Sequence, residues 1–197
     1  MARRLYGLLA TAFDLAPEAE ISIEMDPRVG SRDQVRLLGQ LGFTRVSLGV
    51  QNLDCGVQSA IGRLQTEEET VSLFEACREA GFESINLDLV YGLPRQTAST
   101  FDRTVERVVD LGPDRVATFS YAHLPKLRPN QKAIDEGELP APRVKLGLFL
   151  RALERFRDAG YDWVGIDHFA RRDDELAVAA RERRLQRNFM AARWRSG

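Results

Sequence analysis

The stretch that decides the fold is Ser84-Ile85-Asn86-Leu87-Asp88-Leu89-Val90-Tyr91-Gly92-Leu93-Pro94. Side chains alternate along an extended strand, so Ile85, Leu87 and Leu89 share one face and Asn86, Asp88 and Val90 share the other. The apolar face belongs in a core. We therefore expect Asp88 to point to the inside of a curved sheet.

The same kind of unit repeats on both sides of this strand. Ser31 with Gln34 and Thr66 with Glu69 form capping boxes that begin helices, and glycines follow the apolar stripes where the helices end. We expect strands at 21–25, 45–50, 84–90, 115–121 and 163–166, and helices at 31–42, 66–81, 99–112, 142–160 and 173–187. Alternating strands and helices predict an α/β fold with a parallel sheet and helices outside it. About five units are present, so we expect part of a (β/α) barrel, which needs eight.

Three further segments carry expectations about packing. Leu5, Leu8, Leu9 and Phe13 recur at helical spacing and indicate an amphipathic helix packed on the sheet, although basic residues before an apolar stretch can also be an export signal. In the helix at 142–160, we expect Leu146, Leu150 and Leu153 to form the apolar face. The polar segment 124–142 contains four prolines and is expected to be an ordered excursion or a lid over a site.

Composition excludes several classes of function. The 197 residues are 44% hydrophobic, which is enough for one domain with a core, and no apolar run is long enough to span a bilayer. A net charge of −1 gives no general field for nucleic acid or an anionic membrane, so we expect a small-molecule partner. The two cysteines, Cys55 and Cys77, form no C-x-x-C pair and fit a reducing cytoplasm, with Cys77 in the core.

Polar residues stand where the expected strands end. Glu24 and Asp88 could bind a ligand's hydroxyl or amine groups, or could pair with Arg63 or another basic side chain. Gln51 could contact a ligand or fix a loop, and Arg63 could clamp a carboxylate or phosphate or lie in solvent. His168 could transfer a proton, ligate a metal or bond a backbone carbonyl. A metal-dependent barrel hydrolase or isomerase that uses Glu24, Asp88 and His168 therefore stays an alternative.

Several motifs together resemble one family. They are Glu20-Ile21-Ser22-Ile23-Glu24-Met25-Asp26-Pro27-Arg28, Gly49-Val50-Gln51, Tyr91-Gly92-Leu93-Pro94-Arg95-Gln96-Thr97, Tyr121-Ala122-His123-Leu124-Pro125, Asp167-His168-Phe169-Ala170-Arg171-Arg172-Asp173-Asp174-Glu175-Leu176-Ala177 and Arg187-Asn188-Phe189. The chain resembles the oxygen-independent coproporphyrinogen III oxidases (dehydrogenases), which are radical S-adenosylmethionine (SAM) enzymes of haem biosynthesis. The resemblance covers residues 20–189, and its last two motifs match these oxidases more closely than the related haem chaperone-like proteins.

This resemblance implies a reaction and a set of cofactors. The family converts two propionates of coproporphyrinogen III to vinyl groups, using two SAM molecules and a [4Fe-4S] cluster, and the electron donor is not indicated. The positions that match the family's SAM contacts are Glu24, Gln51, Arg63, Asp88 and Ala122.

Two departures qualify the expected activity. The family's C-x-x-x-C-x-x-C cluster loop and its glycine-rich segment have no match here, and two cysteines cannot replace the loop. We expect an incomplete barrel domain at 1–189 and a divergent tail at 190–197, inactive alone and prone to aggregate at open sheet edges. A non-catalytic remnant that binds SAM or tetrapyrrole is the other alternative.

Overall fold

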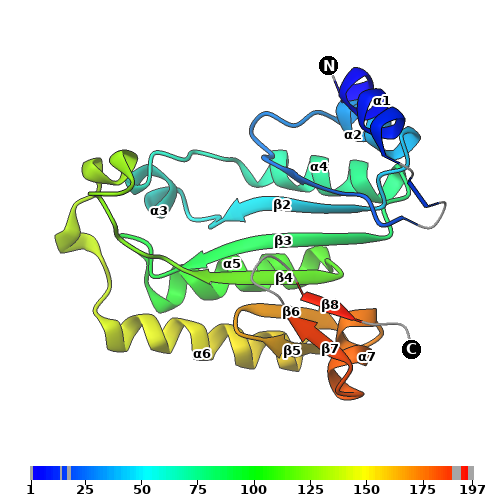
Figure 1. Cartoon of the computed structure of the whole chain (residues 1–197). Helices are drawn as coiled ribbons and strands as arrows, with labels where there is room; N and C mark the ends of the chain where they lie inside the picture. The colour runs from blue at the N-terminus through cyan, green and yellow to red at the C-terminus, as the bar shows by residue number, and fades with distance from the viewer. Residues whose placement is uncertain (1, 14, 17–18, 188–191, 195–197) are drawn as a thin grey trace.

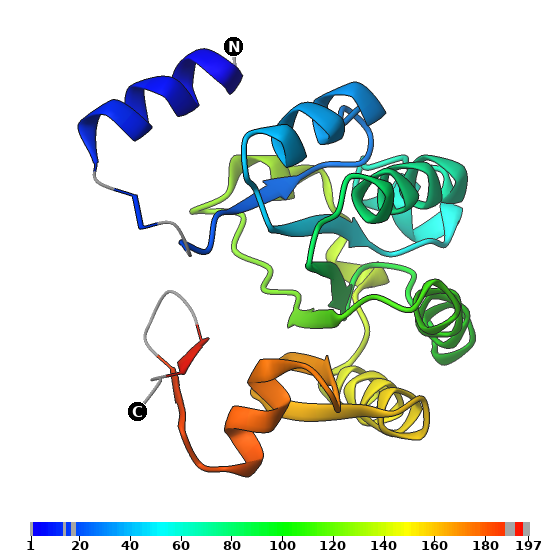
Figure 2. The same ribbon diagram turned by 90° about the vertical axis from the view of Figure 1, so that its right-hand side faces the viewer.

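A curved, mostly parallel sheet forms the centre of the molecule. The computed structural model describes residues 2–13, 15–16, 19–187 and 192–194. The six strands are β1 (Ser22–Met25), β2 (Arg45–Gln51), β3 (Ser84–Tyr91), β4 (Arg115–Ser120), β5 (Tyr161–Gly165) and β6 (His168–Arg171), in the order β1-β2-β3-β4-β6-β5. The pairs β1–β2, β2–β3 and β3–β4 are parallel. Seen end-on, the sheet curves as part of a barrel wall, with the longer helices on its convex side (Figure 2).

Helices cross over between successive parallel strands, as the alternating pattern predicts (Figure 1). They are α2 (Arg32–Gln40), α3 (Cys55–Ala60), α4 (Glu67–Glu79), α5 (Ala98–Leu111) and α6 (Pro142–Asp158). Both predicted capping boxes are confirmed, at Ser31 and at Thr66. A third capping box starts α5 at Thr97, two residues earlier than expected, and the short helix α3 was not predicted.

The hydrophobic core lies between the outer face of the sheet and these helices. Ile85, Leu87 and Leu89 of β3 are completely buried there, and Phe101 of α5 packs in the same core. Cys77 is also fully buried, as expected. The alternation in β3 is therefore confirmed, and it leaves Asn86 and Asp88 on the inner, concave face.

The last two strands depart from the predicted parallel pattern. The segment 161–171 is a hairpin, with β6 antiparallel to both β4 and β5. Only two residues, Ile166 and Asp167, connect β5 to β6, and so short a connection can join only antiparallel neighbours. Ile166 adopts φ 45° and Gly165 φ 127°, which make the tight turn. His168, expected in a loop after a strand, is therefore the first residue of β6.

The charged helix expected at 173–187 is also shorter than its pattern suggested. Helix α7 spans Glu175–Arg181, and a strand, β7 (Leu185–Arg187), pairs with β8 (Ala192–Trp194) in a separate two-stranded sheet. Leu176 and Ala177 of α7 pack on Ala170 of β6, so this helix covers the concave side rather than the outside. Of the tail 190–197 and the motif at 187–189, positions 188–191 and 195–197 lie outside the described residues.

Two packing expectations are wrong. Helix α1 (Ala2–Ala12) forms, but none of its residues is buried, and in Figure 2 it stands away from the sheet. In α6 the buried side chains are Leu148, Ala152 and Phe156; of the expected face, Leu146 and Leu150 are exposed and Leu153 alone packs on the core, partly buried. Both stripes have helical spacing in the sequence, so spacing alone could not show which of them faces the sheet.

Candidate functional site

The strand register brings the predicted polar residues onto one face. Glu24 lies opposite Ser47, and Ser47 lies opposite Asn86, across three neighbouring strands. One row further along, Asp88 lies opposite Ala117, and Ala117 lies opposite His168. Because directly opposed residues share a face, the side chains of Glu24, Asp88 and His168 all belong to the concave side.

Asp88 is held in a hydrogen-bond network at the centre of this face. Ser47 Oγ donates to Asp88 Oδ2 at 2.7 Å, and Asn86 Nδ2 donates to Asp88 Oδ1 at 2.7 Å. Asn86 Nδ2 also donates to Ser47 Oγ at 2.8 Å. Burial raises the pKa of the Asp88 carboxyl, against the lowering effect of these two donors; nearby Glu24 raises it further and His168 lowers it. The salt bridge between Asp88 and Arg63 that we considered from the sequence is not formed.

Arg63 instead stands at the carboxyl end of β2. Its Nη1 pairs with Asp26 Oδ2 at 3.0 Å, and its Nη2 donates to the carbonyl of Gly49 at 2.9 Å. The guanidinium of Arg28, and less strongly that of Arg63, lowers the pKa of Asp26 to about 2. Arg63 Nε is buried without a hydrogen-bond partner among the described residues. Arg63 is therefore held in place through Nη1 and Nη2, while its Nε–H has no acceptor among the described residues.

Gln51 ends β2 beside Arg63. Its backbone has φ 63°, and the pairing of β2 with β3 shifts register between Gly49 and Gln51. A Cβ built on Gly49 would lie 2.9 Å from Gln51 Nε2 and 3.3 Å from Arg63 Nη2. The glycine thus lets both polar side chains lie close to the backbone at the strand end.

Ala122 lies in the turn that follows β4. Its carbonyl accepts a hydrogen bond from Gln131 Nε2 at 3.0 Å, and the preceding Tyr121 donates its N–H to the carbonyl of Tyr91 at 2.9 Å. Lys145 of α6 also donates to the Tyr121 carbonyl. These contacts fix the backbone at the carboxyl ends of β3 and β4.

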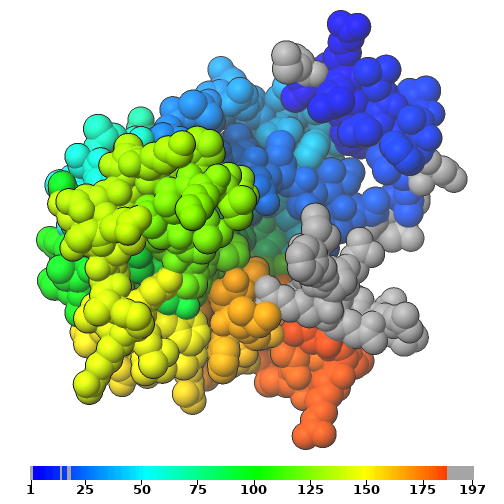
Figure 3. All heavy atoms as spheres, turned by 60° about the vertical axis from the view of Figure 1, so that its left-hand side comes forward, coloured from blue at the N-terminus to red at the C-terminus, as the bar shows by residue number. Residues whose placement is uncertain are grey.

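The segment after Ala122 is ordered, as expected. It contains two 3-10 helices, η1 (Pro129–Ala133) and η2 (Glu136–Glu138). Glu138 accepts the N–H of Arg95 and pairs with its guanidinium at 2.8 Å, which ties this segment to the loop after β3. In Figure 3, where the left-hand side of Figure 1 comes forward, this segment stands at the front in lime and yellow-green. Its role as a lid stays a prediction.

His168 is paired with its neighbour in the chain. His168 Nδ1 lies 2.6 Å from Asp167 Oδ1, and the His168 ring meets Phe119 edge-on at 6.1 Å. Thr118 donates its N–H to the Asp167 carbonyl at 2.7 Å, which fixes the turn on β4. Within the described ranges, no group of three or more His, Cys, Asp or Glu side chains could hold a metal ion. This observation gives no support to the metal-dependent alternative.

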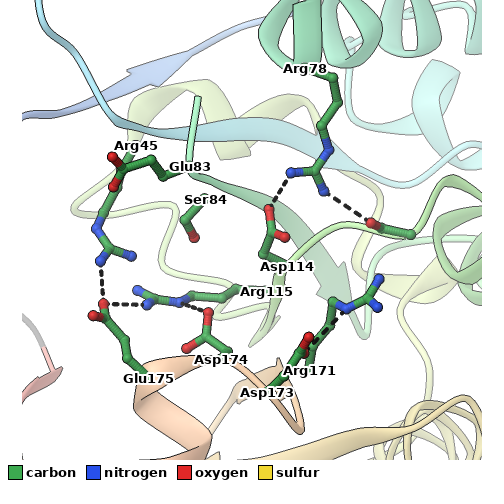
Figure 4. A pocket seen from close by; sticks show the side chains of 11 residues that line it. Arg45, Arg78, Glu83, Ser84, Asp114, Arg115, Arg171, Asp173, Asp174 and Glu175 are labelled. Carbon is green, nitrogen blue, oxygen red and sulfur yellow. Dashed lines mark hydrogen bonds and ion pairs between the residues drawn. The ribbon is translucent and has the colours of Figure 1, made fainter. Parts of the chain in front are cut away.

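The amino ends of the strands carry a second polar cluster, which the sequence did not reveal. Arg45 of β2 and Arg115 of β4 both pair with Glu175 at the start of α7, and Arg115 Nε also lies 2.9 Å from Asp174 (Figure 4). These residues line a pocket of about 670 Å³. Arg45, Arg115, Asp174 and Glu175 each have a partner of opposite charge, so these four residues fasten α7 across the inner face and close that end.

The cysteines do not provide a cluster site. Cys77 is buried in the core, and burial raises the pKa of its thiol to about 12. Cys55 is exposed at the start of α3. A [4Fe-4S] cluster needs several thiolates close together, so these two residues do not fit one. No helix in the described part of the chain is long and apolar enough to cross a membrane.

A family model covers the site. The model of the radical SAM superfamily matches residues 1–108, which include β1, β2 and β3 with Glu24, Gln51, Arg63 and Asp88. This chain belongs to the radical SAM superfamily. The expected resemblance and the partial-barrel fold are thereby confirmed at the level of this family.

Within the radical SAM superfamily, the chain is similar to oxygen-independent coproporphyrinogen III oxidases. The chain is 48% identical over 189 residues to the oxygen-independent coproporphyrinogen III oxidase of Pseudomonas aeruginosa and 46% identical over 186 residues to that of Escherichia coli. These two matches cover 95% and 94% of this chain. The chain spans 41% of the length of each relative. The solved coproporphyrinogen III oxidase of Escherichia coli matches with a TM-score of 0.95 at 45% identity, over 98% of this chain and 44% of that one.

More distant radical SAM structures share the fold alone. The archaeal Elp3 of Methanocaldococcus infernus matches 68% of this chain with a TM-score of 0.57 at 20% identity. A radical SAM methyltransferase of Kitasatospora setae matches 62% with a TM-score of 0.52 at 19% identity.

Proposed function

We propose that this chain is the SAM-binding part of an oxygen-independent coproporphyrinogen III oxidase. In that reaction, two propionate side chains of coproporphyrinogen III become vinyl groups, which gives protoporphyrinogen IX in haem biosynthesis. The proposal rests on two observations: the Asp88 network lies on the concave face, and Arg63, whose Nε has no hydrogen-bond partner among the described residues, is held at the carboxyl end of β2. SAM has groups that suit both, because its ribose and amino groups donate hydrogen bonds and its carboxylate accepts them.

Each predicted site residue takes a role in this proposal. Asp88 and Glu24 accept hydrogen bonds from the ribose hydroxyls or the amino group. Arg63 donates to the carboxylate of the methionyl part, while its bonds to Asp26 and Gly49 hold it in place. Gln51 offers a donor and an acceptor beside it. Ala122 can offer its backbone N–H and the second lone pair of its carbonyl, which already accepts one hydrogen bond from Gln131.

The chain contributes binding rather than the redox step. The family's chemistry uses a reduced [4Fe-4S] cluster to cleave SAM, and Cys55 and Cys77 do not fit such a cluster. We therefore propose that activity needs cysteine ligands supplied from outside the matched 41% of the relatives. The names of these relatives suggest coproporphyrinogen III as the substrate, and we propose a cytoplasmic location because both cysteines are free thiols.

A chimera tests the proposed function. The matching segment of the Escherichia coli relative is replaced by this chain, and the chimera is tested for anaerobic growth of a strain that lacks coproporphyrinogen oxidation. We expect growth without added haem, and loss of growth when the chimera carries Asp88→Ala. A soluble chimera that binds SAM but does not oxidise coproporphyrinogen III would reject the assignment of this chain to that reaction.

A further inference from the structure

The turn that carries Gln51 is strained. Gln51 has φ 63°, which residues other than glycine rarely adopt. The N–H of Asn52 closes the turn by donating to the carbonyl of Val50 at 2.8 Å, so Gln51 is the central residue of a tight three-residue turn. Such a backbone costs free energy and persists only where neighbouring groups hold it. The residues that hold the turn therefore decide where the Gln51 side chain lies.

The side chain of Gln58, in the short helix α3, holds the chain on both sides of this strand end. Its Nε2 donates to the carbonyl of Asn52 at 2.8 Å, and its Oε1 accepts the N–H of Gln65 at 3.0 Å. The Gln58 carbonyl also accepts the N–H of Arg63 at 2.9 Å. Helix α3 lies beyond the carboxyl end of β2 (Figure 1). A single residue thus ties the end of β2 to the loop that carries Arg63.

The amide of Gln58 acts at a distance from any ligand. Its side chain is buried, and its orientation is fixed, because a flipped amide would lose the bonds to Asn52 and Gln65. The same network leaves Asn52 Nδ2 and Gln65 Oε1 buried without hydrogen-bond partners among the described residues. Buried polar atoms without partners lower stability, so stability alone does not account for this network.

We propose that Gln58 is a positioning residue for the bound ligand, which keeps Gln51 and Arg63 in one fixed arrangement at the carboxyl end of β2. The inference rests on the proposed binding of SAM and adds to it a residue that the ligand does not touch. The side chain of Arg63 is held by Asp26 and the Gly49 carbonyl, and its backbone is held by Gln58. Without Gln58, the ligand has to order both side chains as it binds, and this ordering weakens binding.

Gln58→Met tests the inference by calorimetry, because it keeps the length of the side chain and removes both of its hydrogen bonds. We expect the variant to bind SAM about fivefold to tenfold more weakly. In an Arg63→Met background, the same substitution should weaken binding by only about twofold, since its effect passes through that side chain. In an Asp88→Asn background it should keep its full effect, because a separate network holds Asp88 on β3.

A matched variant separates positioning from a general loss of stability. Phe156 of α6 is completely buried against Tyr161 and Phe169, so Phe156→Leu should lower stability and leave the affinity for SAM unchanged. Hydrogen exchange gives a second readout that needs no ligand. Gln58→Met should speed exchange at 50–53 and 62–66 relative to the rest of the chain, and Phe156→Leu should not.

Three results would overturn the inference while leaving SAM binding intact. The first is that Gln58→Met lowers the affinity for SAM no more than Phe156→Leu does. The second is a Gln58→Met penalty of equal size in the Arg63→Met and Asp88→Asn backgrounds. The third is unchanged exchange at both segments in Gln58→Met. Failure of the unmodified chain to bind SAM would instead reject the proposed function, and this inference with it.

Discussion

Ser47 Oγ donates a 2.7 Å hydrogen bond from β2 to the carboxylate of Asp88 on β3. Both residues face the concave side of the sheet, where burial of the carboxyl raises the pKa of Asp88. Ionising Asp88 in the folded chain therefore costs free energy of folding, as is common for residues that serve ligand binding.

Asp88→Asn should change how the stability of the chain depends on pH. A carboxyl whose folded pKa is raised binds its proton more tightly in the folded state, so the unmodified chain should lose stability as pH rises from the unfolded pKa through the raised folded pKa. Asp88→Asn lacks this loss. Urea unfolding between pH 3.5 and pH 8 should show the variant gaining stability relative to the unmodified chain as pH rises. A difference between the two that does not change with pH would contradict the raised pKa.

Asp26→Asn should lower the stability of the fold at neutral pH, and this loss should shrink as the pH falls. Because Arg28 and Arg63 lower the pKa of Asp26 to about 2, its ion pairs stabilise the fold above the unfolded pKa near 4, and that stability is lost as pH falls toward 2. We expect the variant to lose at most about 2 kcal/mol at pH 7 and to show a shallower decline below pH 4. Asp33→Asn, at an exposed pair with Arg36, is the control and should change stability by less than about 0.5 kcal/mol.

Arg115→Met should loosen the closed end of the inner face. The substitution removes the partner of Asp174, whose side chain is only 7% exposed, and one of the two partners of Glu175. Loss of a partly buried pair should cost about 2–3 kcal/mol in denaturant unfolding. Arg172→Met, at a 69% exposed side chain, should cost less than about 0.5 kcal/mol. Equal effects of the two variants would mean that the network does not fasten α7.

Gly92→Ala should displace Lys145. Gly92 has φ +85°, and an added Cβ would lie 2.6 Å from Lys145 Cε, which breaks the bond from Lys145 to the Tyr121 carbonyl. Gly62→Ala, with φ +64° and nothing within 4 Å, carries only the backbone strain of about 1–2 kcal/mol.

A double-mutant cycle separates the clash from the strain. In a Lys145→Ala background, the cost of Gly92→Ala should fall to that of Gly62→Ala, because the atoms that clash are gone. Strict additivity of the two substitutions in unfolding experiments would show that no such contact exists.

The sequence predicts the first four strands and the helices between them well because capping boxes and glycine stops are local signals. The capping side chains of Ser31 and Thr66 form the bonds that their spacing suggests. Alternation within β3 also places Asp88 on the correct face. The same alternation applied to β2 would have drawn attention to Ser47, which shares the face of Gly49, and Asn86 already stood beside Asp88.

The parts that the sequence could not give depend on distant contacts. The hairpin at 161–171 arises because Ile166 and Asp167 make a two-residue turn, whereas a strand pattern does not reveal direction. Arg45, Arg115 and Glu175 are far apart in the chain and meet only in the folded sheet. In α1 and α6, the spacing of apolar residues likewise does not show which side is buried, because this depends on where the rest of the fold lies.

Calorimetric titration of SAM into this chain tests the central claim most directly. We expect saturable binding of SAM, at least tenfold weaker binding in Asp88→Asn and in Arg63→Met, and unchanged binding in Arg36→Met, an exposed control. ATP, which carries phosphates in place of the methionyl part, should bind much more weakly than SAM. Equal affinity of the unmodified chain and both site variants for SAM would contradict the account.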